Sequence, residues 1–111
     1  MAIKIIISDR VTFKVAGTYT DDLGAAQAFD FTLVAQRLTQ DELKARTADG
    51  AGSILDFLQS VVQDWKGVMD GDGKPVAYSA EALRTLCNNV PGAALLAFNA
   101  YFEHVGAKAK N

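Results

Sequence analysis

Apolar and polar positions alternate clearly in the first third of the chain. From Val11 to Tyr19 every second residue belongs to one apolar face, and most residues between them are polar. The alternation returns after the polar break at residues 21–24, with apolar positions at Phe29, Phe31, Leu33 and Ala35. A period of two is typical of strands that bury one face. We therefore expect these two runs to pair as an antiparallel hairpin.

A short β-branched run precedes the hairpin. Residues 3–7 read Ile-Lys-Ile-Ile-Ile and are followed by the polar break Ser8-Asp9-Arg10. This composition predicts a further strand. Two arrangements remain open, in which the strand joins the hairpin or pairs with another subunit. With it, the predicted β-hairpin or small antiparallel sheet occupies about residues 3–37.

Helical signals fill the middle of the chain. Thr39 and Glu42 have the spacing of a capping box, which predicts a helix over about residues 40–49. Ser53 is the expected N-cap of a second helix over about 54–66, whose apolar stripe ends at Trp65. Gly67 is well placed to end this helix with a positive φ.

Two more helices are expected towards the end. Ser79 predicts the start of a helix over about 80–90, and Pro91 ends it and begins another over about 91–105. Beyond Gly106, residues 107–111 form a small basic tail. The predicted fold class is α+β, in which one sheet face is covered by about four short helices. We expect a single domain over 1–111, with residues 1–38 β-rich and 39–111 helical.

Composition narrows the classes of function. A chain of 111 residues with 50% hydrophobic and 22% charged residues suits one globular domain. The net charge of -2 provides no general basic field, so nucleic acid is not an expected partner. Cys87 is the only cysteine and no apolar run could span a bilayer, so we expect an intracellular protein without a membrane partner.

Three features invite a chemical interpretation. His104, near the end of the last helix, has no recognisable catalytic partner, so an exposed position is favoured. Cys87 lies on an apolar stripe and is expected to pack as a small hydrophobe. Residues 70–73, Asp-Gly-Asp-Gly, suggest a calcium loop, but Pro75 stands where an EF-hand needs glycine, which favours a polar turn. We therefore predict no catalytic, metal or cofactor residues and no enzyme activity.

Several short segments, in order, carry a family resemblance. They are Val11-Thr12-Phe13-Lys14-Val15 with Gly17-Thr18; Phe29-Asp30-Phe31-Thr32-Leu33; Arg37-Leu38; Asp64-Trp65 with Gly67-Val68; Gly73 to Ser79; and Gly106 to Asn111. Together they resemble the small tail assembly chaperones of long-tailed bacteriophages, and 64–79 carries most of the resemblance. The family is encoded between the tail tube and tape measure proteins.

The resemblance implies a non-enzymatic assembly factor in the cytoplasm of the bacterial host. Such a factor shields the tape measure protein, helps to recruit tail tube protein subunits and is absent from the mature virion. It needs no cofactor, and a homo-oligomer is compatible with it. Family members are often made in two lengths by frameshifting, and Lys110-Asn111 is a hypothetical place for the shorter product to stop.

The candidate partner surface combines the turn-rich connection with the last helix. Its residues are Trp65, Val68, Met69, Val76, Tyr78, Phe98, Tyr101 and Phe102. Amphipathic helices recognise partners by helix-in-groove contact, although an apolar stripe is also the usual sign of a core. The alternative function is a structural tail component, such as a tube or connector subunit retained in the virion. Its hairpin could add strands to the sheet of a neighbour.

Overall fold

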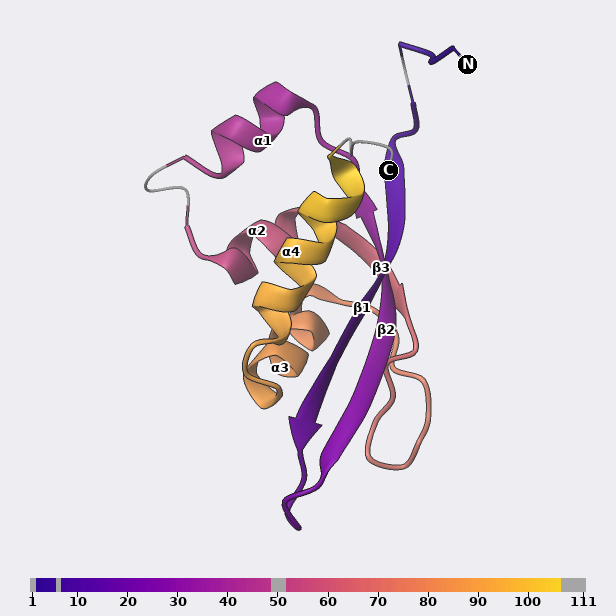
Figure 1. The fold of residues 1–111 in the computed structure, drawn as a ribbon, viewed down its shortest axis with the longest axis vertical. Helices are drawn as coiled ribbons and strands as arrows, with labels where there is room; N and C mark the ends of the chain where they lie inside the picture. The colour runs from indigo at the N-terminus through magenta and orange to yellow at the C-terminus, as the bar shows by residue number, and fades with distance from the viewer. Residues whose placement is uncertain (1, 6, 49–51, 107–111) are drawn as a thin grey trace.

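A three-stranded antiparallel sheet with four helices on one face forms the molecule (Figure 1). The computed structural model describes residues 2–5, 7–48 and 52–106. In chain order the elements are β1 (Arg10–Thr20), β2 (Ala26–Gln36), α1 (Gln40–Arg46), α2 (Ile54–Val61), β3 (Val62–Lys66), α3 (Ala80–Asn89) and α4 (Ala93–Val105). The α+β prediction is confirmed.

The predicted hairpin is the frame of the sheet. Strands β1 and β2 pair in register along their whole length, with Phe13 opposite Leu33 and Val15 opposite Phe31. These four side chains are buried, while the intervening Lys14 is exposed. At the turn, the Asp21 carboxylate accepts hydrogen bonds from the backbone N–H groups of Leu23 and Ala25. The period-two pattern thus defines the covered face of the sheet.

The second predicted helix is wrong beyond Val61. There the chain leaves α2 and enters β3, which pairs with β2 through Leu33 opposite Trp65 and Ala35 opposite Val62. The register shifts between these pairs and leaves Gln63 as an extra residue, which is the geometry of a β-bulge. The bulge returns both Val62 and Trp65 to the buried face. Val62 and Trp65 are therefore three positions apart on one face, which is also the spacing of an apolar stripe on a helix.

The strand predicted for residues 3–7 is also wrong, because the described residues of this segment form no strand. Ile3, Ile5 and Ile7 are 84%, 101% and 63% exposed. The sheet ends beside them, since Arg10 pairs with Gln36 and the Arg37 N–H donates to the Asp9 carbonyl oxygen at 2.8 Å. The chain then turns into α1, so β2 provides no partner for residues 2–8. Ile6 lies outside the described residues.

Helices α1, α2 and α3 start at their predicted caps, whereas the start of α4 and several helix ends differ by a few residues. Complete capping boxes, Thr39 with Glu42 and Ser53 with Asp56, begin α1 and α2. Helix α1 ends at Arg46, before the predicted 49, and residues 49–51 lie outside the described residues. Helix α3 ends at Asn89, and α4 begins at Ala93 after Gly92, whose φ is 94°. Pro91 therefore lies in the connection. The predicted tail at 107–111 lies outside the described residues.

Tyr101 joins α4 to the sheet. Its side chain is fully buried, and its ring lies 6.0 Å from that of Phe13 and 5.5 Å from that of Phe57. The hydroxyl donates to the Gln36 carbonyl oxygen at 2.8 Å and accepts from the Leu38 N–H at 3.3 Å. These bonds fix α4 to the place where β2 ends. The hydrophobic core therefore lies between the sheet, α2 and α4.

Candidate partner-binding surface

The connection between β3 and α3 is a short hairpin fixed to the sheet. The Val76 N–H donates to the Val68 carbonyl oxygen at 2.9 Å, and Met69 and Pro75 form a β-bridge. The indole N–H of Trp65 donates to the Val76 carbonyl oxygen at 2.7 Å, and the Trp65 ring meets that of Tyr78 edge to face at 5.2 Å. These contacts hold Met69 in a defined place beside the sheet.

The acidic part of this connection is the polar turn that the sequence predicts. One oxygen of the Asp70 carboxylate accepts hydrogen bonds from the backbone N–H groups of Asp72 and Lys74, at 2.9 and 3.0 Å. The carboxylate thus stabilises its own loop. Within residues 2–5, 7–48 and 52–106, no three His, Cys, Asp or Glu side chains are placed to hold a metal ion together.

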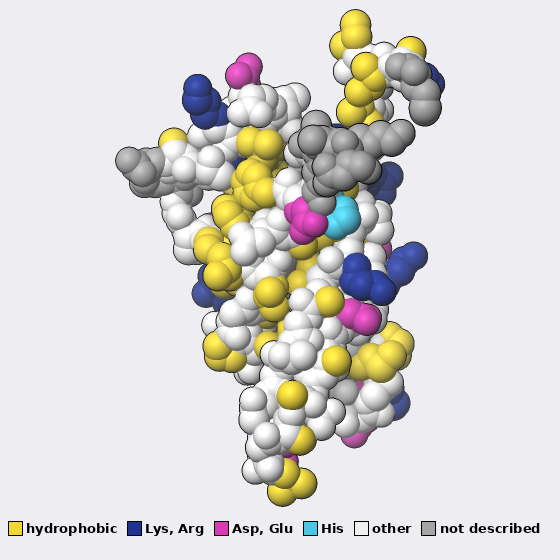
Figure 2. All heavy atoms as spheres, in the orientation of Figure 1, with side chains coloured by type: hydrophobic (Ala, Val, Ile, Leu, Met, Phe, Trp, Pro, Cys, Tyr) yellow, Lys and Arg dark blue, Asp and Glu magenta, His cyan; other side chains and the backbone are white. Residues whose placement is uncertain are grey.

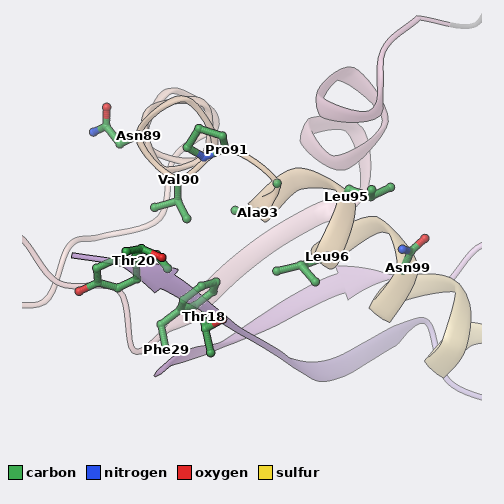
Figure 3. Close-up of a pocket in the computed structure, with 12 residues that line it drawn as sticks. Thr18, Thr20, Phe29, Asn89, Val90, Pro91, Ala93, Leu95, Leu96 and Asn99 are labelled. Atoms are coloured by element: carbon green, nitrogen blue, oxygen red, sulfur yellow. The ribbon is translucent and has the colours of Figure 1, made fainter. Parts of the chain in front are cut away.

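An apolar groove lies between the far end of the hairpin, α4 and the α3–α4 connection. We use "the apolar groove" for the surface lined by Tyr19, Phe29, Met69, Val90, Leu95 and Leu96. Its wider part has a volume of about 690 Å³, and an adjoining part of about 160 Å³ reaches Met69 and shares Tyr19, Phe29 and Val90. Figure 3 shows Leu96 and Val90 pointing from the helical layer towards Phe29 on the sheet.

The groove is exposed and almost uncharged. Tyr19 is 50%, Met69 60% and Leu96 38% exposed, and the informative feature is that these large side chains lie on one surface. No residue lining the wider part carries a charge, and the adjoining part contains Asp30. Contiguous apolar surface of this kind often marks a site of protein interaction. The groove is therefore the strongest candidate for a partner-binding site.

Gly17 determines how deep the groove is. It pairs with Phe29 across the hairpin, and a Cβ atom at this position would stand 2.7 Å from Leu96 Cδ1 and 2.9 Å from Phe29 Cζ. Real Cβ atoms do not approach other atoms so closely, so both side chains occupy space that only glycine leaves free. The floor of the groove thus depends on a missing side chain.

The residues of the partner surface that the sequence predicts lie in different parts of the structure. Trp65 and Tyr101 are 5% and 0% exposed, and both belong to the core. Val68 and Met69 line the groove, whereas Val76 lines a separate hollow that also includes Trp65 and Met69. Tyr78 is half-buried against Trp65, and its hydroxyl oxygen is buried without a hydrogen-bond partner in the described part of the chain.

Phe98 and Phe102 lie elsewhere, in a second patch. Both are half-buried, and their rings lie 5.4 and 5.7 Å from that of Phe57 on α2. Figure 2 shows hydrophobic side chains gathered along this side of the molecule, over α1, α2 and α4. The predicted residues therefore do not form one surface.

The prediction from sequence also missed Tyr19, Phe29 and Leu96. The alternating pattern placed Tyr19 and Phe29 on the buried face of the hairpin, and Leu96 lies outside the apolar stripe that was recognised in the last helix. The strands extend beyond the helices that cover them, so this end of the apolar face stays open. One sequence signal for the open end was available: the apolar positions continue along two strands of 11 residues each.

His104 and Cys87 lie in structural settings. His104 is exposed in the last turn of α4, and its ring stacks on that of Phe13 at 5.9 Å. Cys87 is half-buried on α3, and this burial raises the pKa of its thiol. A raised pKa lowers the thiolate fraction near neutral pH, which agrees with the predicted packing role.

Comparison with known proteins defines the class of protein. The model of a family described as "YdaY prophage protein" matches residues 32–110, which is more than two-thirds of the chain. The chain therefore belongs to this family of prophage proteins. No curated protein and no solved structure matches it. Within the described ranges, none of the helices has the length and apolar character that a membrane span needs.

Proposed function

We propose that this prophage protein is a tail assembly chaperone that acts by binding and not by catalysis. In this role it shields the tape measure protein in the host cytoplasm, helps to recruit tail tube subunits and then leaves. Two facts support the proposal: the resemblance of the ordered sequence segments and the prophage family to which the chain belongs. The observation that carries it is the apolar groove.

The groove suits an amphipathic helix of a tape measure protein. Such a helix presents apolar residues three and four positions apart, and these would lie between Leu96 and Met69 with Phe29 beneath them. An uncharged lining accepts apolar side chains without the cost of desolvating an ion. A surface groove also allows exchange, since tube subunits must finally displace the chaperone.

Coexpression with the tape measure protein of the same prophage tests the proposal. We expect the wild-type chain to raise the soluble fraction of that protein and to co-purify with it. Leu96→Asp places a charge in the groove and should abolish both effects. Leu23→Asp is the matched control, because Leu23 is 88% exposed at the hairpin turn, outside the groove. If Leu96→Asp behaves like the wild type, the groove is not the binding site.

A structural tail component is the second candidate function. It is favoured by β1, which is an edge strand with β2 as its only neighbour among the described strands. Its outer backbone groups could extend the sheet of an adjacent subunit in a tube or connector. Mass spectrometry of purified particles separates the two functions. A chaperone is absent from them, whereas a tube or connector subunit is present in many copies.

A further inference from the structure

Residues 2–8, here called the arm, carry three isoleucines at positions 3, 5 and 7 that the described part of the chain leaves exposed. Ile3 and Ile5 are 84% and 101% exposed, and Ile7 is 63% exposed. In Figures 1 and 2 the arm extends away from the body at one end of the long axis. Alternating isoleucines are typical of a strand with one buried face. The arm thus has the apolar residues that are typical of a packed strand, but these residues are exposed.

The connection at Arg10 limits how far the arm reaches along its own chain. Tyr19 lies nine residues along β1 from Arg10, which is about 30 Å in a strand. In the opposite direction, a fully extended arm places Ile3 at most about 25 Å and Ile5 at most about 18 Å from Arg10. Ile7 reaches less. The arm of the same chain therefore ends short of Tyr19 and reaches at most the near part of the groove around Phe29, whereas the arm of another molecule can place all three isoleucines in the groove.

We propose that the arm of one copy occupies the apolar groove of a second copy. The chemistry is complementary, since three β-branched apolar side chains meet a lining of Tyr19, Phe29, Leu96 and Met69. The charges also agree. Lys4 is the single charged residue of the arm, and Asp30 is the charged residue that lines the adjoining part of the groove. Both surfaces are apolar, and the residues that the structure describes leave both exposed.

The positions of the two surfaces favour a reciprocal dimer. The arm lies at one end of a molecule 50 Å long, and two of the segments that line the groove, the far end of the hairpin and the α3–α4 connection, lie towards the other end (Figure 1). Two copies side by side in opposite directions bring each arm to the groove of its neighbour. Both contacts then form at once under twofold symmetry, which is the commonest symmetry of homo-oligomers. The arm and the tape measure protein would compete for the same groove.

Sedimentation velocity of the full chain tests this proposal. We expect the wild type to dimerise and the variant Ile3→Ser/Ile5→Ser/Ile7→Ser to self-associate at least about tenfold more weakly, because it loses three apolar contacts. The three isoleucines are exposed in the single chain, so this variant should melt like the wild type at concentrations low enough for both to be monomeric. Lys4→Ser is a control on the same segment and should weaken the dimer much less. A wild type that stays monomeric at every attainable concentration would overturn the proposal.

The second surface of the proposed contact, the groove, is tested by the variant Leu96→Asp, with Leu23→Asp as its control. We expect Leu96→Asp alone to be monomeric and the two defective variants, mixed in equal amounts, to form a heterodimer. In that pair the intact arm of the Leu96→Asp chain meets the intact groove of the arm variant. If the mixture stays monomeric, or if Leu96→Asp still dimerises, the arm does not bind in the groove.

The inference is independent of the proposed function. The arm variant keeps an intact groove and should still bind the tape measure protein, with less competition from its own arm. Loss of self-association with retained tape measure binding therefore supports both proposals. A dimer that depends on arm and groove but ignores the tape measure protein would support only this one.

Discussion

Two tyrosines provide a sharp test of how the core is held together. Tyr101→Phe and Tyr78→Phe each remove one hydroxyl group from an otherwise unchanged ring. The Tyr101 hydroxyl bonds to Gln36 and Leu38 backbone groups, whereas the Tyr78 hydroxyl oxygen is buried without a partner in the described structure. The same chemical change should therefore have different effects on stability.

The magnitudes follow from the bonds that are lost. Without the Tyr101 hydroxyl, the buried Leu38 N–H loses its acceptor, and an unpaired buried group costs about 1–3 kcal/mol of unfolding free energy. With a urea m-value of about 2 kcal/mol/M, the unfolding midpoint should fall by about 1 M. Tyr78→Phe removes an already unpaired group, so stability should stay the same or rise by up to about 1 kcal/mol.

Urea unfolding followed by far-UV circular dichroism measures both variants. Tyr19→Phe is the control, because its ring is 50% exposed. The reasoning is refuted if Tyr78→Phe destabilises the protein as much as Tyr101→Phe does. It is also refuted if Tyr101→Phe unfolds at the wild-type midpoint.

Three further predictions concern backbone strain, thiol reactivity and pH. Gly67→Ala should cost about 1–2 kcal/mol in urea unfolding, because Gly67 has a φ of 86°, which L side chains rarely adopt; Gly71→Ala, without a positive φ and in open space, should not. Cys87 should react with iodoacetamide more slowly in the folded protein than in urea, since burial raises its thiol pKa; equal rates would contradict this. Hydrogen bonds from Thr39 lower the pKa of Glu42, so its stabilisation of α1 is complete above about pH 4.3 and is lost as pH falls through the lowered value. An NMR titration midpoint of Glu42 at or above about 4.3 would disprove this.

Local signals were enough to predict the hairpin and the starts of α1, α2 and α3. Val11 to Val15 repeat with a strict period of two, and the Thr39 and Ser53 capping boxes are encoded within four residues. Such features depend on neighbours in the sequence, so the sequence alone reveals them. The elements that depend on them occur where they were expected.

The errors arose where distant contacts decide the structure. The bulge at Gln63 places Val62 and Trp65 on one face of a strand, and this spacing also fits a helix. Pairing with β2 decides between the two, and no local pattern reports it. Residues 3–7 have strand propensity, but the sheet ends beside them. Propensity alone cannot provide a neighbouring strand.

The candidate site was predicted only in part for the same reason. Val68 and Met69 were recognised because they lie in an unusual connection between two elements. Tyr19 and Leu96 are 77 positions apart in the numbering and meet only because α4 packs across β1. A groove between two layers has no signature in either layer alone.

The small size of Gly17 sets the depth of the groove and therefore bears on how strongly the groove could bind a partner. Leu96 and Phe29 rest above it, and even one methyl group at this position would lift both side chains into the groove. A partner would then meet a shallower surface made of the same atoms. A substitution at residue 17, on the sheet side of the groove, would thus change the affinity for a partner without replacing any side chain that the partner contacts.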